Sequence, residues 1–445
     1  MTRSQMLLGM QFTSGYGAEP GAWRLPGVNL SSYTDMDQFV RYSQAAERGK
    51  IQLLFIADTP VLDVDLEDQA PHFPIDPLLV LTAIARETER IGLVATASTT
   101  FNEPYNLARQ FKALDVISRG RAGWNAVTTS DPAAAANFGR EIPPRAEKYE
   151  RAHEVVQIVQ GLWGSWEKDA WLRDVAGSRF ADMDKIQPVN LQGRHVASRG
   201  PLPIPPSEQG QPVIFQAGGG GYGLELAGRY ANGVYANPMT IEDGIAQRNA
   251  LRGAAKRAGR DPDEVKMLAG FMPTIAASRR AALDRRRFLD ESVDLRQRVR
   301  YLGAMIGLPL GYGQIDEPLT ARQLADATPS PHDPRSARAL EVAREGWALR
   351  DVLAHGVIDY HPVVAGTAAD VADHMQEWFE AGAADGFSLA IDGYHDGVDA
   401  FVDQVVPLLQ DRGLFHDDYE GVTLRDHLGA RDQYGLDPRL AESAQ

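Results

Sequence analysis

The run Ala217-Gly218-Gly219-Gly220-Gly221-Tyr222-Gly223 is the first candidate for a binding site. Its glycines satisfy the pattern G-x-G-x-x-G between an apolar strand pattern and a helical pattern, and a helix N-terminus of this kind exposes N–H groups that can hold a phosphate. About four strand–helix units precede it, and no acidic residue directly ends the next strand, at 233–238, which argues against a dinucleotide fingerprint. We predict a phosphate-binding turn at Gly218, Gly219 and Gly220; a turn without a ligand and a Rossmann site remain open.

Polar residues also follow three consecutive apolar runs. Asp58 ends the run 51–58, Ser98 and Thr99 end 91–98, and Asn125 with Thr128 lies in 121–129. In a barrel the carboxyl ends of the strands share one rim, so these side chains would meet there. Each alone is also an ordinary helix cap or turn residue, and Asn125 could be a satisfied core amide.

Arg145 and Tyr149 lie one helical turn apart and could bind a phosphate together, or form part of a solvated helix face. The ten histidines show no metal-ligand spacing, so we predict no metal site. The sequence has neither a G-x-S-x-G elbow nor a Walker A motif, which leaves hydrolase and phosphoryl-transfer chemistry without support. A charged helix over 278–302 is expected to be a solvated face or a partner surface.

The elements that must position these residues alternate between short apolar strands and amphipathic helices. Such alternation predicts an α/β fold with a parallel sheet covered on both faces. We expect a (β/α)8 TIM barrel with insertions, and a doubly wound open sheet is the alternative. The eight predicted strands are 6–12, 51–58, 91–98, 121–129, 212–218, 233–238, 265–277 and 386–392.

Two segments interrupt the alternation, at about 164–211 and 278–365. The first is rich in Gly, Pro and polar residues and is expected to form a loop or hairpin. Neither segment has enough apolar pattern for a core of its own, so we predict one domain over 1–445 with two insertions.

Composition excludes several classes of protein. The 445 residues carry 60 acidic and 45 basic side chains, a formal charge of −15, which argues against a nucleic-acid binder. The absence of cysteine removes disulfides, thiolate metal sites and a cysteine nucleophile. The N-terminus has no signal-peptide pattern and no apolar stretch is long enough for a membrane span, so a cytoplasmic protein that makes no contact with membranes is expected.

Longer blocks of sequence resemble a specific family. IGLVATASTTFNEPYNLARQFKALDVISRGRAGWNAVTT (91–129) resembles the signature block of flavin-dependent monooxygenases of the nitrilotriacetate, dibenzothiophene-sulfone and pristinamycin-synthase group, within the bacterial-luciferase-like superfamily. The resemblance continues through AWRLPG (22–27), FIAD (55–58), LAGRYANGVYA (226–236) and GTAADVADHMQEWFEAGAADGF (366–387). It extends over nearly the whole chain.

The resemblance implies a luciferase-like barrel that takes FMNH2 from a separate NAD(P)H:flavin reductase. With O2 as co-substrate, such a monooxygenase would insert one oxygen atom into a small organic substrate, for example a heterocyclic or a sulfur- or nitrogen-containing one. The cofactor would carry the difficult chemistry and the protein would exclude water, for which segment 278–365 could serve as a lid. A homodimer or homotetramer is usual for the group.

Carried over residue by residue, Asp58, Ser98 and Thr99 would line the flavin, and Thr128 would lie beside Asn125, an amide near flavin and substrate that we predict to be catalytic. Tyr149 matches a tyrosine that contacts the phosphate or the ribityl chain.

Three positions depart from the family pattern. Arg145 stands where the family usually has His, and Gly219-Gly220 stand where a phosphate-binding Ser is usual. The family's His before the AWR motif is also missing, so Tyr16 is a candidate for its role in proton handling. Aromatic residues expected near the barrel mouth are Phe12, Tyr16, Trp23, Phe101 and Trp347.

Two other functions stay open at this point. One is a deazaflavin F420-dependent oxidoreductase of the same fold, which transfers hydride without oxygen. The other is a flavin-binding homologue in which the changes at Arg145 and Gly219-Gly220 abolish turnover.

Overall fold

A computed structural model describes residues 5–62, 64–67, 69–72, 75–218 and 220–436. Eight parallel strands run in the order β1, β2, β3, β4, β7, β8, β9 and β11, and the pairing of β11 with β1 closes the barrel. The predicted (β/α)8 TIM barrel is therefore confirmed, and the open sheet is excluded. The strands are β1 Leu7–Phe12, β2 Leu53–Ile56, β3 Gly92–Ser98, β4 Ala122–Val127, β7 Val213–Ala217, β8 Gly233–Ala236, β9 Lys266–Ile275 and β11 Gly386–Leu389.

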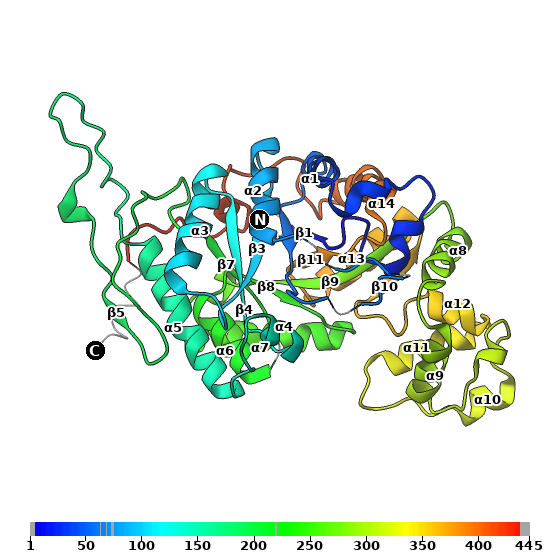
Figure 1. The fold of residues 1–445 in the computed structure, drawn as a ribbon. Helices are drawn as coiled ribbons and strands as arrows, with labels where there is room; N and C mark the ends of the chain where they lie inside the picture. Colours follow the sequence, from blue (N-terminus) through cyan, green and yellow to red (C-terminus); the bar gives the residue numbers. More distant parts are fainter. Residues whose placement is uncertain (1–4, 63, 68, 73–74, 219, 437–445) are drawn as a thin grey trace.

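Helices surround the barrel, and further helices lie beyond it (Figure 1). Their bounds are α1 Met36–Arg48, α2 Pro77–Glu87, α3 Pro104–Ile117, α4 Pro132–Asn137, α5 Arg145–Trp163, α6 Gly220–Tyr230, α7 Ile241–Arg257, α8 Arg279–Asp290, α9 Leu295–Ile306, α10 Ala321–Asp326, α11 Arg335–Arg344, α12 Leu349–Ala354, α13 Ala368–Glu380, α14 Tyr394–Ala400, α15 Val406–Asp411 and α16 Leu424–His427. Proline at the first position starts α2, α3 and α4, where its missing N–H costs nothing. Across the described ranges, we find no helix with both the length and the apolar character needed to cross a membrane.

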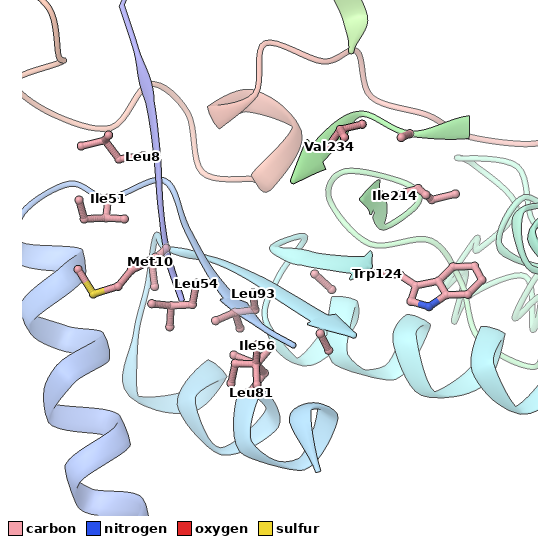
Figure 2. Packing of buried hydrophobic residues seen from close by; sticks show 14 of the residues in the cluster. Leu8, Met10, Ile51, Leu54, Ile56, Leu81, Leu93, Trp124, Ile214 and Val234 are labelled. Carbon is pink, nitrogen blue, oxygen red and sulfur yellow. The ribbon is translucent and has the colours of Figure 1, made fainter. Parts of the chain in front are cut away.

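Alternation along the strands separates two apolar layers. Outward-facing side chains pack under the helices: Leu81 of α2 contacts the cluster that includes Ile56 and Leu93 (Figure 2). Inward-facing residues such as Phe55 and Phe215 fill the barrel interior. Helix α16 closes the amino end of the barrel. Gly92, the first residue of β3, leaves the space for this helix, because a Cβ on Gly92 would lie 2.4 Å from a methyl carbon of Leu424.

Segment 164–211 forms an arm that projects from the barrel at the left of Figure 1. It contains the antiparallel pair β5 Leu191–Gln192 and β6 Ala197–Ser198 and a second bridged hairpin between Trp166 and Ile186. Several of its apolar side chains are exposed, among them Val175 at 92%, Phe180 at 70% and Met183 at 71%. The arm thus presents apolar surface away from the barrel.

Segment 278–365 differs from its prediction in two ways. The prediction of a single charged helix over 278–302 is wrong, because two helices, α8 and α9, occupy this range. The second helix begins at a new cap: the Asp294 side chain accepts hydrogen bonds from the N–H groups of Arg296 and Gln297. The segment also has an apolar cluster of its own, built around Val299, Leu340 and Val352, which corrects the expectation that it lacks one.

The charges of this segment are also less solvated than predicted. Arg286 of α8 is fully buried and forms ion pairs with Glu19 and Asp359, while Arg298 of α9 pairs with Asp359 at 2.7 Å. These pairs connect the first barrel loop to the end of the segment. The chain then enters β10 Val363–Gly366, an unpredicted strand that pairs with the second half of β9 outside the barrel.

Candidate active site

A cavity of about 560 Å³ occupies the carboxyl end of the barrel. Its wall is built from inward-facing positions at the ends of successive strands, which the two-residue period of a strand brings to one side. Those positions include Gln11 of β1, Thr96 and Ser98 of β3, Asn125 and Val127 of β4, Ala217 of β7, Tyr235 of β8 and Met272 of β9. The polar strand ends singled out in the sequence therefore do share a rim.

Asn125 sits in this wall with one half of its amide satisfied. Its side-chain Nδ2 donates to the hydroxyl of Thr96, its neighbour across β3 and β4, at 2.8 Å. The residue is only 2% exposed, and its Oδ1 has no hydrogen-bond partner in the described part of the chain. A buried acceptor left open in this way is suited to a donor group on a ligand.

The other predicted polar residues divide into two groups. Ser98 and Thr128 line the cavity, and the Ser98 hydroxyl hydrogen-bonds that of Thr129 at 2.7 Å. Thr99 does not line it: this residue is fully buried, and its hydroxyl donates to the carbonyl of Val127 at 3.0 Å. Thr99 therefore ties the start of the loop after β3 to the end of β4 and does not face the cavity.

Asp58 lines the same cavity directly after β2. Desolvation, together with the smaller effect of the nearby charge of Asp76, raises the pKa of its carboxyl to about 6. The cavity thus contains a carboxyl group that titrates near neutrality.

Arg145, Tyr149 and the glycine turn meet beside the cavity. The Tyr149 hydroxyl lies 3.7 Å from where a Cβ on Gly218 would sit, and the Arg145 guanidinium lies beside Gly220 at the start of α6. Tyr222 links them, since its ring stacks on Tyr149 at 5.3 Å and lies 5.6 Å from the Arg145 guanidinium carbon. Gly219, the third predicted glycine, lies outside the described residues.

Sequence reasoning missed a second polar cluster in the cavity wall, made of Tyr235, Tyr360 and His361, with Asn237 hydrogen-bonded to His361. The His361 Nδ1 lies 2.8 Å from Asn237 Oδ1, and the Tyr235 hydroxyl lies 3.3 Å from His361 Nε2. Burial lowers the pKa of His361 to about 4 and raises that of Tyr235. The inward position of Tyr235 follows from strand alternation, but Tyr360 and His361 precede the unpredicted β10 and gave no signal.

Tyr16 is placed apart from the cavity wall. Its ring packs with Ala22, Leu25 and Leu289, and its hydroxyl donates to the carbonyl of Leu30 at 2.6 Å. This position lends no support to the catalytic role predicted for Tyr16, which stays a prediction.

The aromatic residues expected at the mouth are also elsewhere. Phe12 faces outward against Phe39 and Tyr42, Phe101 stacks on Phe138, and Trp347 packs in the cluster of segment 278–365. Trp23 packs beside Tyr16. The aromatic side chains that line the cavity are Phe55, Tyr235 and Tyr360.

In the described ranges, no group of three or more His, Asp or Glu side chains is arranged to hold a metal ion. The wall of the cavity offers amide, hydroxyl, carboxyl and imidazole groups.

Comparison with known proteins finds relatives that match this chain along nearly its whole length. The chain is 37% identical to N-acetyl-S-(2-succino)cysteine monooxygenase of Bacillus subtilis (strain 168), over 96% of the chain and 97% of that protein. It is 36% identical to component A of nitrilotriacetate monooxygenase from Aminobacter aminovorans, over 96% of both.

Solved structures of similar enzymes superpose on this fold. EDTA monooxygenase from Chelativorans sp. BNC1 superposes with a TM-score of 0.82 at 32% identity, over 96% of this chain and 99% of that one. A riboflavin lyase solved with a modified FMN superposes with a TM-score of 0.78 at 29% identity, over 99% and 100%. The model of the luciferase-like monooxygenase family matches residues 10–385. The chain therefore belongs to the luciferase-like monooxygenases and is a flavin-dependent monooxygenase.

Proposed function

We propose that this enzyme is the oxygenase of a two-component system that uses FMNH2 and O2 to insert one oxygen atom into a small organic substrate. The observation that carries the proposal is the joining of two features: a cavity at the barrel mouth and an adjacent glycine turn with Arg145 and Tyr149. The first suits a flavin ring with a substrate, and the second suits a phosphate.

The residues present fit such a cofactor. Backbone N–H groups at the start of α6, the Arg145 guanidinium and the Tyr149 hydroxyl are all hydrogen-bond donors, as a phosphate requires. The open Oδ1 of Asn125 offers an acceptor to the ring system, and Ser98 and Thr128 offer hydroxyls in the same wall. Reduced flavin, when bound, would supply the activation of O2.

The chain's own residues would then bind, orient and desolvate the reactants. Phe55 and Met272 form the apolar part of the wall, and Tyr360 and His361 line the cavity from the end of segment 278–365. Their position in the wall supports the role of segment 278–365 as a lid, which we predicted from the sequence. Bulky side chains at these positions would limit the access of water to the reacting atoms.

An enzyme of this kind needs a supplier of reduced flavin, and we propose a separate NAD(P)H:flavin reductase. The names of relatives from two enzyme systems support a multi-component system: component A of nitrilotriacetate monooxygenase, and subunits A and B of pristinamycin IIA synthase. We place the enzyme in the cytoplasm, where reduced nicotinamide is available. The exposed apolar side chains of the arm support a homodimer or homotetramer.

The test is to combine the purified chain with a flavin reductase, NADH and FMN. We expect the chain to bind reduced FMN and to lower the yield of free peroxide when a substrate is present. The proposal is wrong if reduced F420 binds under anaerobic conditions and reduced FMN does not. If neither cofactor binds at high micromolar concentration, the chain is a homologue without turnover.

A further inference from the structure

Lys148 lies between the two parts of the proposed cofactor site. It is on α5, three residues after Arg145 and directly before Tyr149, so the three side chains share one face of the helix. Helix α5 lies beside α6, which begins at the glycine turn (Figure 1). Lys148 is only 6% exposed, whereas Arg145 is exposed. The Lys148 side chain is therefore directed into the protein and not toward solvent.

The Lys148 ammonium group holds the loop that follows β4. Its Nζ donates to the carbonyl of Thr129 at 2.9 Å and to the hydroxyl of Ser130 at 2.8 Å. Thr128, Thr129 and Ser130 all line the cavity. Two hydrogen bonds from one charged donor thus join the helix of the phosphate contacts to the wall of the cavity.

The same loop is tied to the end of β3 on its other side. The Thr129 hydroxyl hydrogen-bonds that of Ser98 at 2.7 Å, and the Thr129 N–H donates to the hydroxyl of Thr100 at 3.0 Å. Lys148 adds the connection to α5. The loop is therefore held between a strand end of the barrel and the helix that carries Arg145.

The charge of Lys148 stands where a helix disfavours a cation. Lys148 is in the first turn of α5, and the N-terminal end of a helix carries partial positive charge. Burial and, to a smaller extent, the charge of Arg145 lower the pKa of Lys148. In the described ranges, neither cation forms an ion pair with a carboxylate. A phosphate at the glycine turn would be attracted by both charges.

We propose that Lys148 is a positioning residue for the flavin: it sets the loop of Thr129 and Ser130, and with it the cavity wall, relative to the phosphate contacts on α5. This rests on the proposed function, in which the phosphate binds at the glycine turn and the ring system in the cavity. A ligand that touches both parts binds more tightly when their spacing is fixed beforehand. Lys148 acts on the ring system through the loop, whereas Arg145 acts on the phosphate directly.

Two flavins separate these roles in the full chain. Riboflavin lacks the phosphate, so its affinity, measured by fluorescence quenching, reports on the ring part alone. Lys148→Met should lower the affinity for riboflavin about fivefold and that for FMN at least as much, because two hydrogen bonds to the loop are lost. Arg145→Ala should lower only the FMN affinity. The proposal is overturned if Lys148→Met keeps its riboflavin affinity, because Lys148 would then act only as a second charge on the phosphate.

The route through the loop is tested at its other end. Ser130→Ala removes the hydroxyl that accepts from Lys148. It should lower riboflavin affinity about twofold in the wild-type chain and have no effect in Lys148→Met, because both changes break the same contact. Equal effects in the two chains overturn the route through Ser130.

A control separates positioning from a general loss of stability. Leu409→Ala shortens a fully buried side chain on α15, which packs on the outside of the barrel. It should lower the free energy of unfolding and leave riboflavin affinity unchanged. A loss of riboflavin affinity in Leu409→Ala equal to that in Lys148→Met would assign both effects to stability and overturn the proposal.

Hydrogen exchange tests the link without any flavin. Amide exchange in residues 128–131 should rise in Lys148→Met, and not in Glu147→Gln, which removes an exposed charge from the same turn of α5. Unchanged exchange overturns the proposal. If Lys148→Met does not fold, the same measurement on Ser130→Ala, at an exposed position, decides.

The two sets of measurements keep this inference separate from the proposed function. A wild-type chain that binds neither flavin contradicts the proposed function, and the role of Lys148 toward the flavin fails with it. Unchanged exchange in residues 128–131 together with intact flavin binding contradicts the role of Lys148 alone.

Discussion

The Nη2 atom of Arg145 lies 2.8 Å from the position that a Cβ on Gly220 would take. The sequence resemblance predicts that both positions differ from the family pattern, and the structure brings them together. The arginine needs the volume that a side chain in the glycine turn would fill. A phosphate bound at this turn would meet the Arg145 guanidinium together with the backbone N–H groups at the start of α6.

Replacing Arg145 tests the phosphate site. Arg145→Ala should weaken FMN binding about tenfold or more, because a hydrogen bond between charged groups contributes about 1.5–3 kcal/mol. Riboflavin has the same ring system without the phosphate, and its affinity should not change. Both are measured by fluorescence quenching, and equal losses for the two flavins would show that Arg145 acts on the ring or the fold.

Gly220 tests the conformation of the turn. Its φ of +80° is left-handed, so Gly220→Ala should destabilise the protein by about 1–2 kcal/mol before any contact with Arg145. Gly221→Ala is the matched control, since a Cβ there has no atom within 4 Å. Urea unfolding of both variants gives the comparison, and similar stabilities would contradict the structure of the turn.

Asp58 predicts a pH dependence of stability. Its folded pKa of about 6 lies above the ordinary value of 3.8, so the folded state binds the proton more tightly. This contribution to stability is present below the ordinary pKa and is lost as the pH rises through about 6. Asp58→Asn should therefore stabilise the protein at pH 8 and not at pH 4.

The size of this gain should be about 1 kcal/mol, because the partly exposed side chain is screened by water. Melting temperatures at the two pH values, with Glu67→Gln as control, measure it. A gain that does not depend on pH would assign the effect to something other than titration.

The arm predicts self-association. Phe180→Asp combined with Val175→Asp should shift the enzyme toward a smaller species in light scattering, because the substitutions place charge in the apolar contact of an oligomer. Leu79→Asp, at a comparably exposed position on α2, should not. A wild-type chain that is monomeric at all concentrations would rule out the oligomer.

Arg286 tests the charge cluster that fixes the end of segment 278–365. Arg286→Met leaves Glu19 buried without its cation and removes one of the two arginines that pair with Asp359, so it should cost about 3–5 kcal/mol of unfolding free energy. Arg322→Met removes a pair in which the arginine side chain is 92% exposed and should cost less than about 1 kcal/mol. Chemical unfolding of the two variants measures both losses of unfolding free energy. Equal losses would mean that the buried ion pairs do not stabilise the fold.

Sequence periodicity was sufficient for the barrel, because strands that are apolar on both faces read as unbroken runs, as 51–58 and 91–98 do. It also located Ser98, Asn125 and Thr128, since the ends of parallel strands share one rim. It could not find His361, which reaches the cavity from a segment with no barrel strand, nor foresee that Arg286 is buried. Charged side chains look solvated in a sequence until their partners, here more than 70 residues away at Asp359, are placed beside them.

The apolar cluster of segment 278–365 has a consequence for the dynamics of the enzyme. Because Val299, Leu340 and Val352 pack on one another and not on the barrel cluster, this part of the chain has the means to open as a cooperative unit of its own. Native-state hydrogen exchange would then show two levels of protection, a lower one in α9 and α11 and a higher one in the barrel strands. The cavity rim at Tyr360 and His361 lies where these two units join, so a substrate could be admitted through a local opening that leaves the barrel folded.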